Sequence, residues 1–122
     1  MAKKKILIVD DSVQTRKSLK DILLKNNYHI VGEAKNGTEA IKLIHNLSPD
    51  IVMLDIRMPQ MGGIETLRML RNINQNLKII MVSAIDSIDK VKEYMKAGAN
   101  HYILKPFEEA KVIEIITKVT GS

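Results

Sequence analysis

Reactive side chains stand directly after short apolar runs in this sequence. The reactive residues are, in chain order, Asp10, Asp11, Asp55, Ser83 and Lys105. The runs before them are Ile6–Val9, Ile51–Leu54, Ile79–Val82 and Tyr102–Leu104. Each run is near-continuously apolar and rich in β-branched residues, which is typical of a strand buried on both faces. Because the carboxyl ends of parallel strands meet at one edge of a sheet, we expect the carboxylates, hydroxyl and amine to share one crevice.

The charges of this crevice predict a divalent cation. Three clustered carboxylates, Asp10, Asp11 and Asp55, repel one another, and Lys105 offsets only one of their charges. Carboxylate oxygens without His or Cys favour Mg²⁺, with Mn²⁺ as the alternative ion. The three histidines are scattered along the chain without metal-ligand spacing, so we interpret them as surface or structural residues.

A carboxylate, a metal ion, a hydroxyl and a lysine together suit phosphoryl transfer to an aspartate. The carboxylate attacks in line, the cations neutralise the equatorial oxygens, and the hydroxyl donates a further hydrogen bond. The sequence contains neither a G-x-x-x-x-G-K-[ST] loop nor a G-x-G-x-x-G turn, so ATP is not the expected donor. The phosphoryl group is then expected to come from a small donor or from another protein.

Segments with helical periodicity separate the apolar runs. The residues expected to face the core are Val13, Leu19, Ile22 and Leu23 in the first segment, Ala40, Ile41, Ile44 and Leu47 in the second, Ile64, Leu67, Leu70 and Ile73 in the third, Ile88, Val91 and Met95 in the fourth, and Val112, Ile115, Ile116 and Val119 in the fifth. Pro49 and Gly98 are typical of helix ends. A weaker run, Ile30–Ala34, contains a glycine and a charge and suits an edge strand.

Five strands thus alternate with five helices. This alternation requires a parallel sheet, because each crossover helix must return over one face of it. Right-handed crossovers favour a flavodoxin-like (βα)5 doubly wound α/β fold with strand order 2-1-3-4-5. We expect residues 1–122 to form one domain, without an output domain.

Composition excludes several other classes of function. The chain has no cysteine, which rules out disulfides and thiolate catalysis. No apolar run approaches the roughly 18 residues of a membrane span, and the basic start is not followed by a secretion signal, so a soluble, cytoplasmic protein without membrane insertion is expected. The net charge is +5, but with only 3% aromatic residues nucleic-acid binding is not expected. A mild preference for acidic partners is the better interpretation.

Four motifs together resemble the signature of response-regulator receiver domains of two-component systems. They are Val9-Asp10-Asp11, the segment from Leu54 to Gly63, Val82-Ser83-Ala84, and Lys105-Pro106-Phe107. The resemblance covers essentially the whole chain and is greatest to the stand-alone, CheY-like type, which serves chemotaxis or phosphorelays.

The resemblance implies a role for each residue of the crevice. Asp55 matches the phospho-accepting aspartate, which also contributes to the metal site. Asp11 matches the direct Mg²⁺ ligand, and Asp10 matches the acidic partner that acts mainly through metal-bound water. The backbone carbonyl of Arg57 matches the third protein ligand. Lys105 matches the lysine that contacts the phosphoryl group.

The resemblance also implies a switch and its partners. Ser83 matches the switch hydroxyl and Tyr102 the switch aromatic. The phosphoryl donor is expected to be a histidine kinase or a histidine phosphotransfer protein. A downstream protein is expected to read the state of the receiver on the face of the fourth helix, fifth strand and fifth helix. Such a domain is not an enzyme with a separate substrate, but it assists its own phosphorylation and dephosphorylation.

Some positions vary within the family or depart from its common pattern. Gly62 stands where Asp or Asn is frequent, which should loosen the loop after Asp55. Arg57 and Ile85 lie two residues beyond Asp55 and Ser83, so they are expected to tune rates and to slow hydrolysis by shielding the phosphoryl group from water. The resemblance also implies a cis peptide bond before Pro106.

Three alternatives to this switch remain. The chain could act as an intermediate phosphate carrier in a phosphorelay, or as a degenerate receiver that binds partners without phosphorylation. It could also be a flavodoxin-like flavin or nucleotide binder, although it lacks a glycine-rich phosphate loop and the aromatic residues that stack a flavin.

Overall fold

The strands form one parallel sheet with the order β2-β1-β3-β4-β5. The computed structural model describes all residues except 1–2, 56–61, 85–87 and 122. The strands are β1 (Lys5–Val9), β2 (His29–Ala34), β3 (Ile51–Asp55), β4 (Lys78–Ser83) and β5 (His101–Leu104). The predicted flavodoxin-like order is confirmed, and the weak run containing Gly32 is indeed an edge strand. Asp55 and Ser83 are the last residues of β3 and β4 and do not lie just beyond them.

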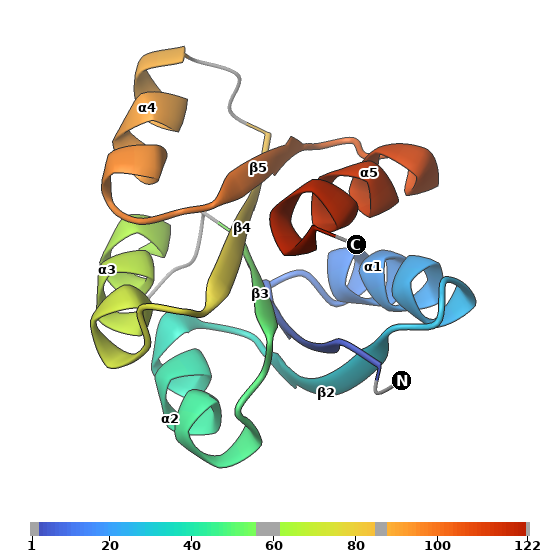
Figure 1. Cartoon of the computed structure of the whole chain (residues 1–122), viewed down its shortest axis with the longest axis horizontal. Coiled ribbons are helices and arrows are strands. Elements are labelled where there is room, and N and C mark those ends of the chain that lie inside the picture. Colours follow the sequence, from blue (N-terminus) through green and yellow to red (C-terminus); the bar gives the residue numbers. More distant parts are fainter. Residues whose placement is uncertain (1–2, 56–61, 85–87, 122) are drawn as a thin grey trace.

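Helices cover both faces of the sheet (Figure 1). They are α1 (Val13–Lys25), α2 (Gly37–Leu47), α3 (Gly63–Ile73), α4 (Ile88–Lys96) and α5 (Glu109–Thr120). Helices α1 and α5 pack on one face, and α2, α3 and α4 pack on the other (Figure 1). Alternate residues of β1 divide between the two layers, with Ile6 and Ile8 facing α1 and α5 while Leu7 and Val9 face the opposite layer. Both faces of the central strands are therefore buried, which explains their near-continuous apolar sequences.

The register of the sheet aligns the carboxyl ends of its strands. Val9 pairs with Leu54, Asp55 pairs with Val82, and Ser83 pairs with Leu104. The residues that end or follow these strands therefore gather at one edge, as expected for an open parallel sheet.

Two of the three residues of α4 that were predicted to face the core do not do so. Ile88 and Met95 are 71% and 41% exposed, whereas Tyr94 is only 3% exposed. The residues that pack against the core are instead Tyr94 and, just beyond the end of the helix, Ala97, while Val91 is half-buried. The large ring of Tyr94 buries more apolar area than either aliphatic side chain would, so it sets the rotation of the helix.

Two further residues predicted to face the core lie at helix ends and are exposed. Val13, the first residue of α1, is 71% exposed, and Ile73, the last residue of α3, is 40% exposed. Helix ends project beyond the sheet that they cover, so their periodicity no longer reports burial. The other predicted inward residues of α1, α2, α3 and α5 are buried or packed against the core.

The caps of the helices near the carboxyl edge differ in strength. Ser12 caps α1, where its side-chain oxygen accepts a hydrogen bond from the amide of Thr15 at 3.2 Å. Asn36 caps α2 in the same way, accepting from the amide of Glu39 at 2.8 Å. Gly62 stands at the cap of α3 and has no side chain to offer, so this helix begins without that stabilisation.

Arg71 joins α3 to the turn after α4 at the opposite edge of the sheet. Its guanidinium donates to the carbonyl of Leu77, to the carbonyl of Gly98 at 2.7 Å and to the side-chain oxygen of Asn100 at 2.9 Å. That side-chain oxygen also accepts from the amide of Ile79 at 2.8 Å. Burial lowers the pKa of Arg71, yet a guanidinium stays charged at neutral pH. Gly98 has a φ of +117°, and a Cβ there would lie 3.0 Å from the Arg71 side chain.

Replacing Arg71 should destabilise the fold. In Arg71→Met, the Leu77 and Gly98 carbonyls lose a charged donor in a partly buried region, which we expect to lower the free energy of unfolding by about 2–4 kcal/mol. Urea unfolding followed by circular dichroism measures this change. The control is Arg68→Met, an exposed arginine of the same helix, which should change stability by less than about 0.5 kcal/mol. Equal effects from both variants would show that the Arg71 network contributes little.

Candidate functional site

The structure brings three carboxylates together at the carboxyl edge of the sheet. Asp10 and Asp11 follow β1, and Asp55 ends β3, so the order of the strands makes them neighbours. One carboxylate oxygen from each of the three lies within 4.8 Å of the others. Asp10 and Asp55 are only 1% and 4% exposed, whereas Asp11 is open to solvent. The cluster thus has a buried base and an accessible mouth.

Lys105 lies against the two buried carboxylates. Its Nζ is 3.2 Å from Oδ2 of Asp10 and 3.5 Å from Oδ1 of Asp55. Its side chain is 25% exposed, so the ammonium has lost part of its contact with water and lies between the carboxylates of Asp10 and Asp55. The peptide bond from Lys105 to Pro106 is cis, as the resemblance implied.

A pocket of about 290 Å³ opens beside this cluster. Its lining residues are Asp11, Asp55, Ala84 and Lys105. Two acids and one amine therefore border a space in which a small charged group can contact all three. Such a pocket suits a cation together with an anion, because neither charge alone would satisfy both kinds of side chain.

Every polar group of Asp10 has a partner. Its amide donates to the carbonyl of Ala34 at 3.0 Å, which continues the pairing of β1 with β2. Its Oδ1 accepts from the amide of Ser12 at 2.9 Å, and its Oδ2 receives Lys105. Its carbonyl accepts from the guanidinium of Arg16 on α1. A nearly buried carboxylate needs such compensation, since each polar group left unpaired would cost free energy.

Ser83 ends β4, and Tyr102 lies on the neighbouring strand β5, where it pairs with Met81. Ser83 is 4% exposed, and its carbonyl accepts from the amide of Lys105 at 2.8 Å, which ties the end of β4 to the chain after β5. Tyr102 is half-buried, and its ring centroid is 5.5 Å from that of His101. Tyr102 lies between a pocket of about 140 Å³ shared with α4 and one of about 470 Å³ beside α5. The ring therefore has space on two sides.

The predicted site residues fall into three groups. Asp10, Asp11, Asp55 and Lys105 meet around one pocket, while Ser83 is buried at the adjacent strand end. Tyr102 borders other pockets. Arg57 and Ile85 lie outside the described residues.

One contact of the site was missed at the level of sequence. Arg16 reaches the carbonyl of Asp10 from α1, and its other side pairs with Glu33 of β2. A signal was available, because an arginine in the second turn of a helix opposes the helix dipole and needs a local reason.

The donor set fits a divalent cation of the hard type. All three side chains are carboxylates, and Mg²⁺ is usually bound through one or two carboxylates together with waters. With one oxygen from each carboxylate within 4.8 Å of the others, Asp10, Asp11 and Asp55 could hold such a cation between them.

Comparison with known proteins agrees with this arrangement. The pattern of the response regulator receiver domain matches residues 6–117. The chain belongs to the response regulator receiver family. It is 45% identical to the chemotaxis protein CheY of Thermotoga maritima over 117 residues, covering 96% of this chain and 98% of that protein. It is 43% identical to the CheY of Bacillus subtilis, over 93% of this chain and 95% of that one.

A solved structure shows the same receiver architecture. It is the CheX-CheY-BeF3-Mg²⁺ complex from Borrelia burgdorferi, which matches with a TM-score of 0.94 and 38% identity and covers 96% of this chain and 89% of that one. The receiver described here is thus a CheY-like signalling domain. Within the described part of the receiver, no helix is long and apolar enough to cross a bilayer.

Removing one carboxylate of the receiver should have opposite effects with and without metal. Asp11→Asn keeps the side-chain shape, relieves repulsion in the cluster, and should raise the melting temperature of the metal-free protein. For the wild type, Mg²⁺ at ten times its dissociation constant should stabilise the fold by about 1.4 kcal/mol, and the variant should lose most of that gain. Thermal unfolding with and without Mg²⁺ measures both effects.

The matched control is Asp21→Asn, an exposed acid on α1. It should leave the response to Mg²⁺ unchanged. An equal Mg²⁺ response in wild type and Asp11→Asn would place the cation elsewhere.

Proposed function

We propose that this receiver is a phosphorylation-controlled switch that accepts a phosphoryl group on Asp55 from a histidine kinase or a histidine phosphotransfer protein. The observation that carries the proposal is the contact of Lys105 with Asp55 at 3.5 Å, beside a pocket that Asp11 also lines. The carboxylate of Asp55, the ammonium of Lys105 and the exposed carboxylate of Asp11 border the same space. This is the set that in-line transfer to a carboxylate needs.

The residues divide the work of the transfer. Asp55 attacks phosphorus, and the donor histidine leaves as its bond to phosphorus breaks. Lys105, already held by Asp10, can shift from Asp55 to a phosphoryl oxygen without losing its other partner. Ser83 would donate to a second oxygen. Asp11, Asp10, Asp55 and the carbonyl of Arg57 would hold Mg²⁺, which supplies positive charge for the phosphoryl oxygens.

This division of roles explains how a receiver assists its own chemistry. A carboxylate nucleophile has no proton to lose as it attacks, so this chemistry requires no general base. The contribution of the protein is positioning and charge neutralisation, which act in transfer to Asp55 and in later hydrolysis alike.

Replacement of Asp55 tests the proposal directly. Asp55→Asn keeps the shape of the side chain and removes the nucleophilic oxygen, so labelling by acetyl phosphate with Mg²⁺ should be lost. Mass spectrometry of the intact protein measures the added mass. The control Asp10→Asn retains the nucleophile and should be labelled more slowly, by about tenfold or more, because Lys105 loses one of its holding partners. Undiminished labelling of Asp55→Asn would exclude Asp55 as the acceptor.

The output face is proposed to be formed by α4, β5 and α5. Ile88, Val91 and Lys92 of α4 line the smaller pocket with Tyr102 and Leu104 of β5. Movement of Ser83 toward a phosphoryl group would open space near β4 and β5 into which the ring of Tyr102 can turn. The Borrelia burgdorferi relative forms a complex with CheX, BeF3 and Mg²⁺, which supports a protein partner for this receiver.

This switch predicts a measurable change at Tyr102. Addition of beryllium fluoride, a tetrahedral analogue of a phosphoryl group, together with Mg²⁺ should shift the ring resonances of Tyr102 and the amide resonances of β5 in NMR spectra. In Ser83→Ala the analogue should still bind, but the shifts at Tyr102 should shrink, since the linking hydroxyl is gone. Tyr28, on the opposite side of the sheet against α1 and α5, serves as the internal control. Unchanged Tyr102 resonances in the loaded wild type would argue against the switch.

The setting of the receiver follows from the same proposal. The receiver would work in the cytoplasm through contacts with other proteins and would not need nucleic acid or membrane insertion. Matching the CheY of Thermotoga maritima over 98% of that protein supports this. Transfer from phosphorylated Asp55 to a histidine phosphotransfer protein would identify a phosphorelay carrier instead.

A further inference from the structure

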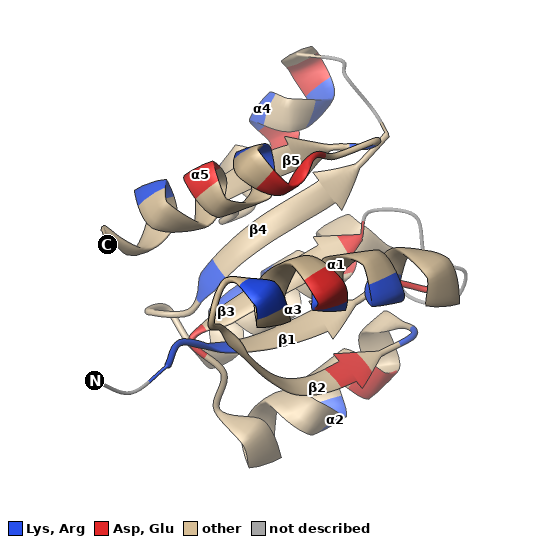
Figure 2. Ribbon diagram, turned by 90° about the vertical axis from the view of Figure 1, so that its right-hand side faces the viewer, with Lys and Arg blue, Asp and Glu red and all other residues tan. Residues whose placement is uncertain are grey.

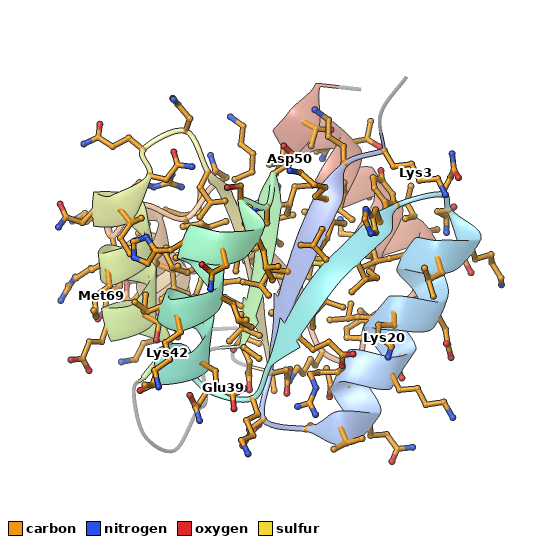
Figure 3. The ribbon with its side chains drawn as sticks, turned by 90° about the horizontal axis from the view of Figure 1, so that it is seen from below. Lys3, Lys20, Glu39, Lys42, Asp50 and Met69 are labelled. Atoms are coloured by element: carbon orange, nitrogen blue, oxygen red, sulfur yellow. The ribbon has the colours of Figure 1, made fainter. Side chains whose placement is uncertain are left out.

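A charged cluster joins α1 to β2 beside the acidic site. Arg16 donates from Nη1 to the carbonyl of Asp10 and from Nε to Oε1 of Glu33 at 3.1 Å. Lys20, one turn later on α1, donates to the other oxygen of Glu33 at 2.9 Å. Figure 2 shows α1 running beside β2, and Figure 3 shows Lys20 on that helix. The hydrogen bond from Lys20, with further contributions from Arg16, lowers the pKa of Glu33, so this carboxylate is ionised at neutral pH.

The position of Arg16 is unfavourable for the helix itself. It lies near the amino end of α1, where the helix dipole repels positive charge, and the first turn contains no acidic residue to compensate. Its side chain is nevertheless only 15% exposed. A permanently charged group in that position needs specific partners, and among the described residues it bonds Glu33 and the carbonyl of Asp10.

The bond to the Asp10 carbonyl fixes the direction of the next residue. A peptide unit is planar, so holding the Asp10 carbonyl sets the plane that also contains the amide of Asp11. The amide and the carboxylate of Asp10 are held independently, by Ala34, Ser12 and Lys105. The guanidinium of Arg16 thus completes the set of contacts that aims Asp11 into the pocket.

The register of β2 places Glu33 where it can hold Arg16. A bulge between Ile6 and Leu7 shifts the pairing of β1 with β2, so that Glu33 pairs with Ile8. Paired residues of parallel strands point to the same face, and Ile8 faces the layer of α1 and α5. Without the bulge Glu33 would pair with Val9, on the opposite face, and could not reach α1.

We infer that Arg16, held by Glu33, is a positioning residue for the divalent-cation site of this receiver. The inference rests on the proposed function, because it concerns the same site. Arg16 should affect the affinity for Mg²⁺ in two opposite ways, which can be measured separately. The positive charge of Arg16 repels a nearby cation, so its charge alone would weaken Mg²⁺ binding, whereas its two-sided hydrogen bonding strengthens binding by holding Asp10 and Asp11 in place.

Arg16→Lys separates the two effects. Lysine keeps the charge but lacks the planar fork that bonds the Asp10 carbonyl and Glu33 at once. We expect the dissociation constant for Mg²⁺, measured by isothermal titration calorimetry on the unphosphorylated protein, to rise about tenfold. Glu33→Gln, which weakens the hold on Arg16 without touching the site, should raise it about threefold. In the double variant the two effects should not multiply, because both act through the same guanidinium.

The matched control is Lys20→Met. It removes a positive charge and a hydrogen bond from the same Glu33 but does not contact Asp10, so the dissociation constant should stay within about twofold of the wild-type value. Thermal unfolding without Mg²⁺ verifies that each variant is folded. If Arg16→Lys does not fold, Glu33→Gln still tests the inference.

The outcomes distinguish the inference from the proposed function. If the wild type does not bind Mg²⁺, the proposed function fails. If the wild type binds Mg²⁺ and both Arg16→Lys and Glu33→Gln bind it equally well, the site is present and the positioning role is overturned. Tighter binding by Arg16→Lys would likewise overturn it.

Discussion

The contact of one ammonium with two nearly buried carboxylates is the interaction on which the site depends. Asp10 and Asp55 come from neighbouring strands and would repel one another in a region of low solvent access. Lys105 offsets one charge and leaves a net negative site next to solvent-exposed Asp11. This remaining charge attracts a cation, and the partial hold on Lys105 leaves it able to shift to a new anion. The excess of negative charge over the single charge of Lys105 therefore explains how the site can bind both a divalent cation and a phosphoryl group.

The two edges of the sheet have different physical characters. At the carboxyl edge, charged groups are held in partial compensation, which leaves them responsive to ligands. At the amino edge, Arg71 satisfies several carbonyl oxygens and Asn100, and fastens the turn after α4 to α3. Helix α4 is buried mainly through Tyr94 and is fastened at its carboxyl end. Its amino end, near Ile88, is exposed and lies on the side of Tyr102, where the proposed switch would need freedom to move.

The fold and the grouping of four polar residues at the carboxyl edge could be predicted because each depends on residue type and position alone. Asp10, Asp11, Asp55 and Lys105 follow or end apolar runs, and a parallel sheet brings such positions together without further information. The face of α4 could not be predicted in this way. Ile88, Val91 and Met95 match a helical stripe as well as Val91 and Tyr94 do, and only packing of the large ring against the core decides between them.

The position of Arg16 in α1 indicates that it needs a local partner, but which partner it has could not be predicted from residue type and position. Its role requires Glu33 to point toward α1, and alternation along an edge strand predicts that direction only when the register is known. The bulge near Gly32 sets the register, and the space there is limited, because a Cβ on Gly32 would lie 2.7 Å from the side chain of Leu47. The absence of a side chain at Gly32 thus lets α2 approach β2. The bulge beside Gly32 turns Glu33 toward Arg16. Because Arg16 also bonds the carbonyl of Asp10, the bulge affects the backbone of the acidic site.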